Sequence, residues 1–517
     1  MKAFLLHGER DFDPQQPLPP QATALTQDLE LETLFQAMAA GDEFLLDVAR
    51  KVVLSVMKND IDTILYRQEI VKDCLQNPGA VRQLYDLALE AVTREKKGYW
   101  GFLSKYPGSI LHDAIQGLEI FTEVLRKLRG VAEEQSGRFQ SRGFTALFAM
   151  LRKELSDEYL AAVQEHLTEL RFKHGVLLSA ELGKGSATCN FLLRKPHGET
   201  RGWLARLLSR APARYTFRLH PRDEAGGRIL TEMRDRGINH VASALGQSRD
   251  HVLSFFVTLR TELAFYAGCL NLHERLAAME EPSCFPRPAP AGQRRHSFSE
   301  LYDVCLALTM GRKAVGNSAD AEDKSLVIIT GANQGGKSTF LRSAGLAQLM
   351  MQCGMFVPAR SFDAELCTDL FTHYKREEDA TMKSGKLDEE LARMSDIADL
   401  IRPDSLVLFN ESFAATNERE GSEIARQVVS ALLEKRVKVF FVTHQYEFAR
   451  GFFETETNAA LFLRAERKAD GTRTFRVREG EPLQTSFGED LYREIFGSAP
   501  EAETAAPAHT AAKRASR

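Results

Sequence analysis

One stretch decides the fold of the C-terminal half of the chain: Leu326-Val-Ile-Ile-Thr-Gly331-Ala-Asn-Gln-Gly-Gly336-Lys337-Ser338-Thr339. An apolar run of strand length leads into a glycine-rich turn with the spacing GxxxxGK(S/T), and a helical pattern follows. The glycines let successive backbone N–H groups face one concavity, which holds phosphate groups together with the amino end of the next helix. The sequence therefore predicts a phosphate-binding loop between a buried strand and a helix.

The polar residues of this loop have expected partners. The Lys337 ammonium is placed to reach the β- and γ-phosphates of a nucleotide, and the Ser338 hydroxyl is placed to ligand Mg²⁺. ATP and Mg²⁺ are therefore the predicted cofactors. A glycine-rich turn without nucleotide is the alternative, which the joint presence of strand, loop, lysine, serine and helix disfavours. The predicted nucleotide-binding residues are Gly331, Ala332, Asn333, Gln334, Gly335, Gly336, Lys337, Ser338 and Thr339.

A second apolar run, Ser405–Phe409, ends in Asn410 and Glu411, which is the form of a Walker B strand. In that form the first acid organises Mg²⁺ through water, and the second polarises the attacking water. Asn410 keeps the shape and an acceptor oxygen of the expected Asp but loses a negative charge beside the cation. We therefore expect weaker Mg²⁺ binding or slower ATP turnover, with Glu411 as a catalytic residue. A simple strand-end turn is the alternative.

A third apolar run, Val437–Thr443, ends at His444. A histidine at the tip of the strand after Walker B can contact the γ-phosphate and sense it, so His444 is the second predicted catalytic residue. A structural histidine at a strand end is the alternative. From about Phe298 onward such runs alternate with helical stretches, which predicts a mostly parallel sheet covered on both faces.

The end of the chain carries three further signals. Leu461–Arg464 and Arg473–Val477 flank an Asp470-Gly471 turn and predict a hairpin. Residues Glu489–Phe496 predict a helix. Residues 497–517 are rich in Ala, Pro, Thr and Glu without periodicity, which predicts a disordered tail.

The N-terminal half has helical periodicity. Apolar residues recur at three- and four-residue steps, which is typical of core-facing helices. The stripe from Leu151 to Leu170 predicts one long helix, and the stripe from Val252 to Leu270 predicts another. Both stripes are interpreted as ordinary core.

Between these stripes lies a basic segment. From Arg194 to Arg222 there are eight basic residues and one acid, Glu199, with strand-like pieces at Cys189–Leu193 and Tyr215–Leu219. We predict a basic, β-containing insertion that contacts DNA, and a solvated surface is the alternative. The predicted DNA-binding residues are Arg194, Lys195, Arg201, Arg206, Arg210, Arg214, Arg218 and Arg222.

Composition limits the function. The chain has 517 residues and a net charge of -4, so a DNA-binding prediction depends on a local patch. The seven cysteines form no CxxC pair, which argues against a zinc ribbon or disulfide framework and suits a reducing cytosol. No apolar run approaches the roughly 20 residues that span a bilayer. We expect a cytoplasmic protein without membrane contact, associated with the nucleoid if the source is bacterial.

Several of these motifs together resemble a known family. The phosphate-binding loop, Gly354-Met-Phe-Val-Pro-Ala359, the Ser405 to Glu411 strand and Thr443-His444 are similar to the ATPase domain of the MutS DNA mismatch-repair family, over about residues 298–496. The resemblance implies an ABC-type P-loop ATPase domain and a preceding helical lever, and it puts the family's DNA clamp at the basic insertion. The fold class is therefore multidomain: an α-helical core with a small β-containing insertion, then an α/β P-loop ATPase domain. The expected parts are 1–30 (irregular leader), 31–180 (helical core), 181–225 (basic insertion), 226–279 (returning lever helices), 280–297 (linker), 298–496 (ATPase domain) and 497–517 (tail).

The resemblance also implies a homodimer. In the family, a signature segment of one subunit contacts the ATP of its neighbour. The best local candidate runs from Ser384 to Glu390, with Ser384, Gly385 and Glu390 as the predicted residues and Leu387 in place of the usual aromatic.

The function implied is an ATPase that switches a dimeric clamp on DNA during DNA repair. Family members that read mismatches carry an additional N-terminal domain with a Phe-x-Glu wedge, and too few residues precede the helical core here for that domain. Branched or otherwise distorted DNA is therefore an alternative target to mismatches. A second hypothesis is a nucleotide-dependent switch that binds another protein, such as a repair partner, and not DNA. An SMC- or transporter-like ATPase would need long heptad arms or membrane spans, and the sequence has neither.

Overall fold

The computed structural model describes the chain with several gaps and divides it into two compact units. A helical unit comprises Met1–Pro19, Thr33–Ala278 and Gln352–Met355, and a sheet unit comprises Pro20–Glu32, Met279–Met351 and the residues from Phe356 onward. The described residues are 1–98, 106–173, 175–195, 215–376, 385–455, 459–468 and 471–484. The chain is thus multidomain and helical with mixed sheets, as predicted.

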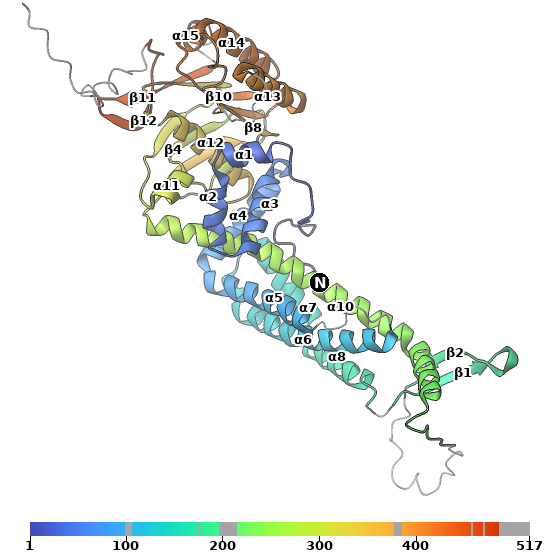
Figure 1. The fold of residues 1–517 in the computed structure, drawn as a ribbon. Coiled ribbons are helices and arrows are strands. Elements are labelled where there is room, and N and C mark those ends of the chain that lie inside the picture. Colours follow the sequence, from blue (N-terminus) through green and yellow to red (C-terminus); the bar gives the residue numbers. More distant parts are fainter. Residues whose placement is uncertain are drawn as a thin grey trace, which may run out of the picture. The chain divides into compact units, whose positions relative to one another are not determined.

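The helical unit is organised around α10 (Glu224–Ala278), a single helix of 55 residues where returning lever helices were expected. Helices α5 and α6 run alongside it (Figure 1). By length and composition α10 could cross a membrane, but 67% of its most apolar 18-residue window is buried, as in the core helix of a globular unit. Among the described residues, the other α-helices that contribute to this unit are α2 (Leu31–Ala39, whose first two residues belong to the sheet unit), α3 (Glu43–Leu54), α4 (Ile61–Gln76), α5 (Pro78–Gly98), α6 (Pro107–Gln135), α7 (Arg142–Glu154) and α8 (Asp157–Leu170).

The prediction of one long helix along the stripe from Leu151 to Leu170 is wrong. The helical conformation is interrupted between α7 and α8, where the Ser156 side chain accepts a hydrogen bond from Tyr159 N. A serine followed by two acidic residues is a helix start signal, because it caps free N–H groups and complements the helix dipole. Local capping therefore prevails over the continuous apolar stripe.

The N-terminal residues are held by a buried carboxylate. Glu262 of α10 is fully buried and accepts hydrogen bonds from the backbone N–H groups of Leu5 (2.6 Å), Leu6 (3.3 Å) and Phe12 (2.8 Å). The expected irregular leader over residues 1–30 is also wrong at its end, because Ala22–Asp28 forms helix α1. The leader is therefore an integral part of the fold.

A β-hairpin lies near the amino end of α10 (Figure 1). It consists of β1 (Leu178–Leu182) and β2 (Thr188–Leu193), which pair antiparallel. Leu178 packs so closely on α10 that a Cβ at Gly237 would lie 2.3 Å from its Cδ2. The predicted strand at Cys189–Leu193 matches β2. The one at Tyr215–Leu219 is wrong, because these described residues pair with no strand and Tyr215 is 94% exposed.

The sheet unit contains a six-stranded sheet with the strand order β12-β11-β6-β10-β9-β8. All neighbours are parallel except β11 and β12, which form the predicted hairpin. The mostly parallel sheet is thus confirmed. The strands are β6 (Leu326–Gly331), β8 (Leu370–Tyr374), β9 (Leu406–Asn410), β10 (Lys438–Val442), β11 (Ala460–Arg467) and β12 (Arg473–Glu479).

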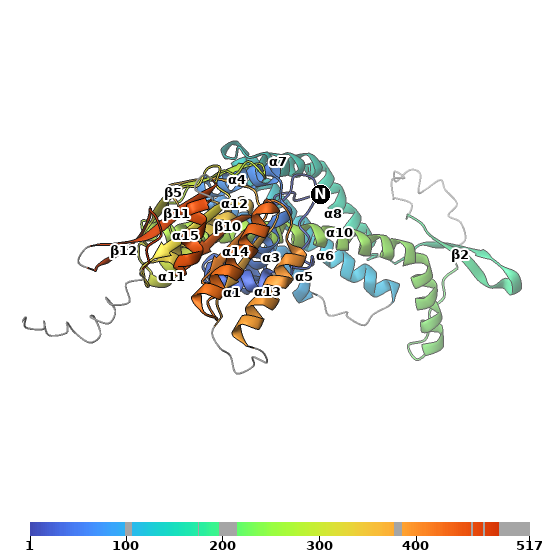
Figure 2. The ribbon, with the colours of Figure 1, turned by 90° about the horizontal axis from the view of Figure 1, so that it is seen from above.

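Helices cover both faces of this sheet. Val407 and Phe409 of β9 share one core with α13 (Lys386–Leu400), α14 (Glu418–Glu434) and α15 (Tyr446–Thr455), the last two lying beside each other (Figure 2). Leu408, which points the other way, faces Gly345 of α12 (Lys337–Gln352). The alternation along β9 follows from the two-residue period of a strand.

The predicted linker over residues 280–297 is wrong. Arg287–Ala289 forms strand β3, and β4 (His296–Leu301) begins within the same stretch. With β5 (Asn317–Asp320) and β7 (Ser361–Glu365) they make a four-stranded sheet in the order β3-β7-β4-β5. Pro288 is tolerated in β3 because β3 is an edge strand, where a proline without an N–H group can be accommodated. A short helix, α11 (Val304–Met310), follows β4.

Candidate functional site

The three predicted catalytic motifs meet at one edge of the six-stranded sheet, the edge formed by the carboxyl ends of its parallel strands. Val442 of β10 pairs with Ile329 of β6 on one side and with Asn410 of β9 on the other. Because these strands are parallel, the loops that follow them lie at the same edge. Gly331, Glu411 and His444 are therefore brought together, as the order of the motifs predicts.

The phosphate-binding loop has the backbone that its glycines allow. Gly331 and Gly336 have φ values of 108° and 89°, which favour glycine. A Cβ at Gly331 would lie 2.9 Å from Ala465 N of β11, so a side chain has no room there. The loop wraps the Lys337 ammonium, which donates to the carbonyls of Gly331 and Ala332 at 3.0 Å each. The cation is thus fixed at the centre of the loop.

The Lys337 ammonium and the Glu411 carboxylate influence each other beside the loop. Lys337 is only 5% exposed, and burial lowers its pKa, although the nearby Glu411 carboxylate opposes this shift. His444 Nδ1 lies 3.8 Å from Glu411 Oε1, and this neighbour, helped by Lys337, holds the pKa of Glu411 below its usual range. Glu411 is therefore a carboxylate at neutral pH, as a group that polarises water must be.

The pair expected to hold Mg²⁺ is in contact. Ser338 Oγ donates a hydrogen bond to Asn410 Oδ1 at 2.9 Å. No group of three or more His, Cys, Asp or Glu side chains in the described ranges could hold a metal by itself. A hydroxyl and an amide oxygen are hard oxygen ligands that suit Mg²⁺ when phosphate oxygens complete the shell. These residues fit Mg²⁺ bound with a nucleotide.

A cavity of about 820 Å³ opens over the loop, a size typical of ligand sites. Of the predicted residues, Asn333 to Thr339 line it together with Glu411 and His444. Sequence reasoning missed the opposite wall, which comes from the segment around α11 and from β12. The segment around α11 has no motif, and Phe475 is one aromatic residue of β12 with no motif around it. The missed lining residues are Asp303, Leu306, Met310, Arg312, Lys313, Ala314, Val315, Asn317 and Phe475.

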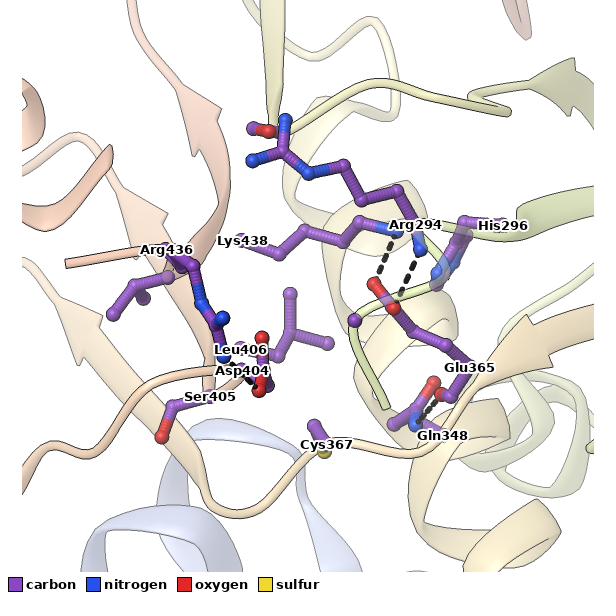
Figure 3. A pocket seen from close by; sticks show the side chains of 13 residues that line it. Arg294, His296, Gln348, Glu365, Cys367, Asp404, Ser405, Leu406, Arg436 and Lys438 are labelled. Atoms are coloured by element: carbon purple, nitrogen blue, oxygen red, sulfur yellow. Dashed lines mark hydrogen bonds and ion pairs between the residues drawn. The ribbon is translucent and has the colours of Figure 1, made fainter. Parts of the chain in front are cut away.

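A second, smaller cavity of about 170 Å³ lies at the opposite edge of the sheet, where Ser405 precedes β9 and Lys438 begins β10 (Figure 3). Its ionic groups include two ion pairs. Lys438 Nζ lies 3.0 Å from Glu365 Oε1, and Arg436 Nη2 lies 2.7 Å from Asp404 Oδ2. Within each pair the two charges neutralise each other, so neither pair is left to bind a charged ligand. The larger cavity is therefore the candidate functional site.

Two of the three predicted signature residues, Gly385 and Glu390, lie in the described part of the chain. Ser384 lies outside the described residues, and Gly385 is the N-cap of α13. Glu390 is only 3% exposed, and its Oε2 accepts a hydrogen bond from Phe413 N of the same unit at 2.7 Å. In the single chain, the Glu390 carboxylate is thus hydrogen-bonded within its own subunit. The contact of Glu390 with the nucleotide of a neighbouring subunit stays a prediction.

Half of the predicted DNA-binding residues lie in the described part of the chain. Arg194 Nε donates to Ser179 Oγ at 3.0 Å, and Lys195 pairs with Glu169 at 3.0 Å. Arg218 and Arg222 are exposed. The other four, Arg201, Arg206, Arg210 and Arg214, lie outside the described residues.

Two family models match the chain. The MutS2 N-terminal domain matches residues 59–279, and MutS domain V matches residues 327–498. The chain belongs to the MutS family. The MutS resemblance is thus confirmed, and the match now includes most of the helical unit. The 820 Å³ cavity is lined in part by residues of the MutS domain V match, and the β1–β2 hairpin lies in the N-terminal match.

Curated MutS relatives match parts of the chain. The DNA mismatch repair protein MutS of Leptospira interrogans is 27% identical over 282 residues, which is 53% of this chain and 32% of the relative. MutS of Lactobacillus acidophilus is 29% identical over 40% of this chain and 26% of the relative. MutS of Syntrophomonas wolfei is 36% identical over 25% of this chain and 15% of the relative. The matches span at most about a third of the length of these MutS proteins.

Proposed function

We propose that this chain is an ATPase of the MutS family whose nucleotide cycle controls the binding of DNA. The observation that carries the proposal is the meeting of a phosphate-binding loop, an ionised glutamate and a histidine around one cavity. The MutS domain V match and the curated mismatch-repair relatives support it. ATP and Mg²⁺ are the proposed cofactors.

Each residue has a proposed role in hydrolysis. The backbone N–H groups of residues 333–338 and the Lys337 ammonium bind the phosphates. Ser338 Oγ and, through water, Asn410 Oδ1 would hold Mg²⁺, which would supply positive charge beside the β- and γ-phosphates. Glu411 orients the attacking water and accepts its proton. His444, beside Glu411, donates to the γ-phosphate and so reports its presence.

Asn410 predicts a weak Mg²⁺ site that one substitution should strengthen. Asn410→Asp restores a negative charge near the cation, so the Mg²⁺ concentration that gives half-maximal ATP hydrolysis should fall about five- to tenfold. A Mg²⁺ titration at saturating ATP measures this. Asn417→Asp, which changes the N-cap of α14 by the same charge, is the matched control and should leave the titration unchanged. An unaltered midpoint for Asn410→Asp would mean that a neutral ligand suffices.

DNA is the proposed partner of the helical unit, and a homodimer is the proposed assembly. The basic segment that follows the β1–β2 hairpin supports DNA binding, because clustered cations attract the phosphate backbone. Mismatched, branched or otherwise distorted duplexes are the proposed targets. The competing function is a nucleotide-dependent switch for a partner protein, which the net charge of -4 permits.

An electrophoretic shift series separates these functions. We expect complexes with homoduplex, mismatched and branched DNA that weaken steeply as salt rises and that change when ATP is added. The DNA with the largest ATP response identifies the preferred structure. Absence of any complex at low salt with a folded, ATP-binding protein would favour the partner-protein function.

A further inference from the structure

The turn at residues 411–413, which carries Glu411, has a backbone conformation that depends on contacts with its surroundings. Glu411 and Phe413 have φ values of 53° and 61°, in the left-handed region that non-glycine residues rarely adopt. A backbone of this kind persists only where its surroundings hold it. The direction of the Glu411 side chain therefore depends on the groups that fix this turn.

Buried hydrogen bonds fix the turn at three points. Glu411 N donates to Val442 O at 2.9 Å, within the sheet. Phe413 N donates to Glu390 Oε2 at 2.7 Å, and Phe413 O accepts from Gln445 Nε2 at 3.1 Å. Gln445 directly follows His444, so the same turn links the two predicted catalytic residues.

The middle residue of the turn, Ser412, is held by His373, which is itself hydrogen-bonded to Glu390. Ser412 is fully buried, and its Oγ donates to His373 O at 2.6 Å and lies 2.7 Å from His373 Nδ1. His373 Nε2 lies 2.9 Å from Glu390 O, to which it donates. Burial lowers the pKa of His373 to about 4, so the ring is neutral at physiological pH. Glu390 thus supports the turn twice, through its carboxylate and through its carbonyl.

Close packing leaves the turn little freedom to adopt another course. A Cβ at Gly421 of α14 would lie 2.3 Å from Phe413 O, and Phe413 itself is fully buried. Of the contacts that hold the turn, the Glu390 carboxylate is the one side-chain acceptor for a backbone N–H of the turn among the described residues. Without it, the Phe413 N–H is left buried and without a partner, which disfavours the present backbone.

We propose that Glu390 is a positioning residue for ATP hydrolysis, which acts through the Phe413 N–H to hold the turn that aims Glu411 at the attacking water. This inference rests on the proposed function, in which Glu411 polarises that water. It differs from the role predicted from the sequence, because Glu390 acts within its own subunit. Small misplacements of a reacting group reduce rates strongly, by about 10²-fold for an error of 1 Å.

The test compares three variants. Glu390→Ala removes the acceptor and should lower the single-turnover rate of ATP hydrolysis about 10- to 100-fold, with ATP affinity within about twofold of the parent. Glu390→Gln keeps an oxygen that can accept the Phe413 N–H and should stay within about threefold of the parental rate. Glu389→Ala is the matched control, because Glu389 is the neighbouring carboxylate on α13 and pairs with Arg393.

A double variant distinguishes positioning from a general structural role. In a Glu411→Gln background, Glu390→Ala should cause no further loss of rate, because it acts through Glu411. Additive losses, or a parental rate for a folded Glu390→Ala, would overturn the proposal. Loss of ATP-driven dimerisation with an unchanged rate per bound ATP would instead assign Glu390 to the subunit interface.

Two further results keep the inference apart from the function on which it rests. If Glu411→Gln alone hydrolyses ATP at the parental rate, the proposed catalytic role of Glu411 fails. If Glu390→Ala does not fold, Glu390→Asp, which withdraws the carboxylate by one methylene, takes its place. A parental rate for folded Glu390→Asp would overturn the positioning role, and a rate lowered at least tenfold with retained ATP affinity would support it.

Discussion

Glu411→Gln should bind ATP with parental affinity and hydrolyse it at least about 100-fold more slowly. Glutamine matches the shape of glutamate but does not accept a proton from water, and a general base contributes about 10²- to 10⁴-fold to a rate. His444 Nδ1 lies 3.8 Å away and Lys337 is close, which together keep Glu411 ionised in the parent. Single-turnover hydrolysis with a parallel measurement of nucleotide binding checks both expectations.

The pH profile of the parent adds a second check. Because the pKa of Glu411 is lowered, its charged form persists to lower pH than that of an ordinary glutamate. The loss of rate caused by protonation of Glu411 should therefore be half complete only at a pH below the usual value of 4.5. Glu434→Gln, at the exposed end of α14, is the control for loss of a carboxylate and should leave the rate unchanged.

The Glu411→Gln variant, in which ATP hydrolysis is blocked, should also show the oligomeric state of the ATP-bound protein. If two chains close on ATP, Glu411→Gln held with ATP should be a dimer by light scattering at micromolar concentration. A monomer under these conditions would contradict the proposed homodimer, whatever the hydrolysis rate. It would leave the chemistry assigned to Glu411 intact.

The catalytic edge of the sheet could be predicted because its signals are local. Apolar runs of strand length identify β6, β9 and β10, and the end of each observed strand lies within one residue of the prediction. Parallel strands place the loops that follow them at one edge of the sheet. The proximity of Lys337, Glu411 and His444 could therefore be predicted without information on long-range contacts. The φ values at the loop glycines follow from the same local pattern.

The opposite wall of the cavity could not be predicted in this way. Asp303 and Asn317 reach the site because a second sheet packs beside the first, and no spacing in the sequence records that packing. The same lack of tertiary information explains why the proline-rich stretch around β3 suggests a linker. It also explains why the hydrogen bond between Glu390 and Phe413 could not be predicted, because the two residues are 23 positions apart in the chain.

Reversing the charge of Arg201, Arg206, Arg210 and Arg214 to Glu should weaken DNA binding by about 10²- to 10³-fold at moderate salt. The eight cations between Arg194 and Arg222 repel one another unless acids or a polyanion neutralise them, and the segment itself supplies only Glu199. Each phosphate contact releases condensed counterion, with a salt slope of about -0.9 per contact on duplex DNA. Loss of four contacts should therefore flatten the slope by roughly 3 to 4 units.

The loss should be equal for homoduplex, mismatched and branched DNA, because phosphate contacts position the protein without reading bases. ATP hydrolysis without DNA should persist, since the cavity belongs to the sheet unit. Reversal of the exposed Arg126, Arg138, Arg152 and Arg275 of the helical unit makes the same change in net charge and is the matched control. If both quadruple variants weaken binding equally, the effect comes from overall charge and the assignment of the basic segment fails. If neither variant does so, DNA contacts another surface or is not the partner, and the nucleotide-dependent protein switch becomes the better account.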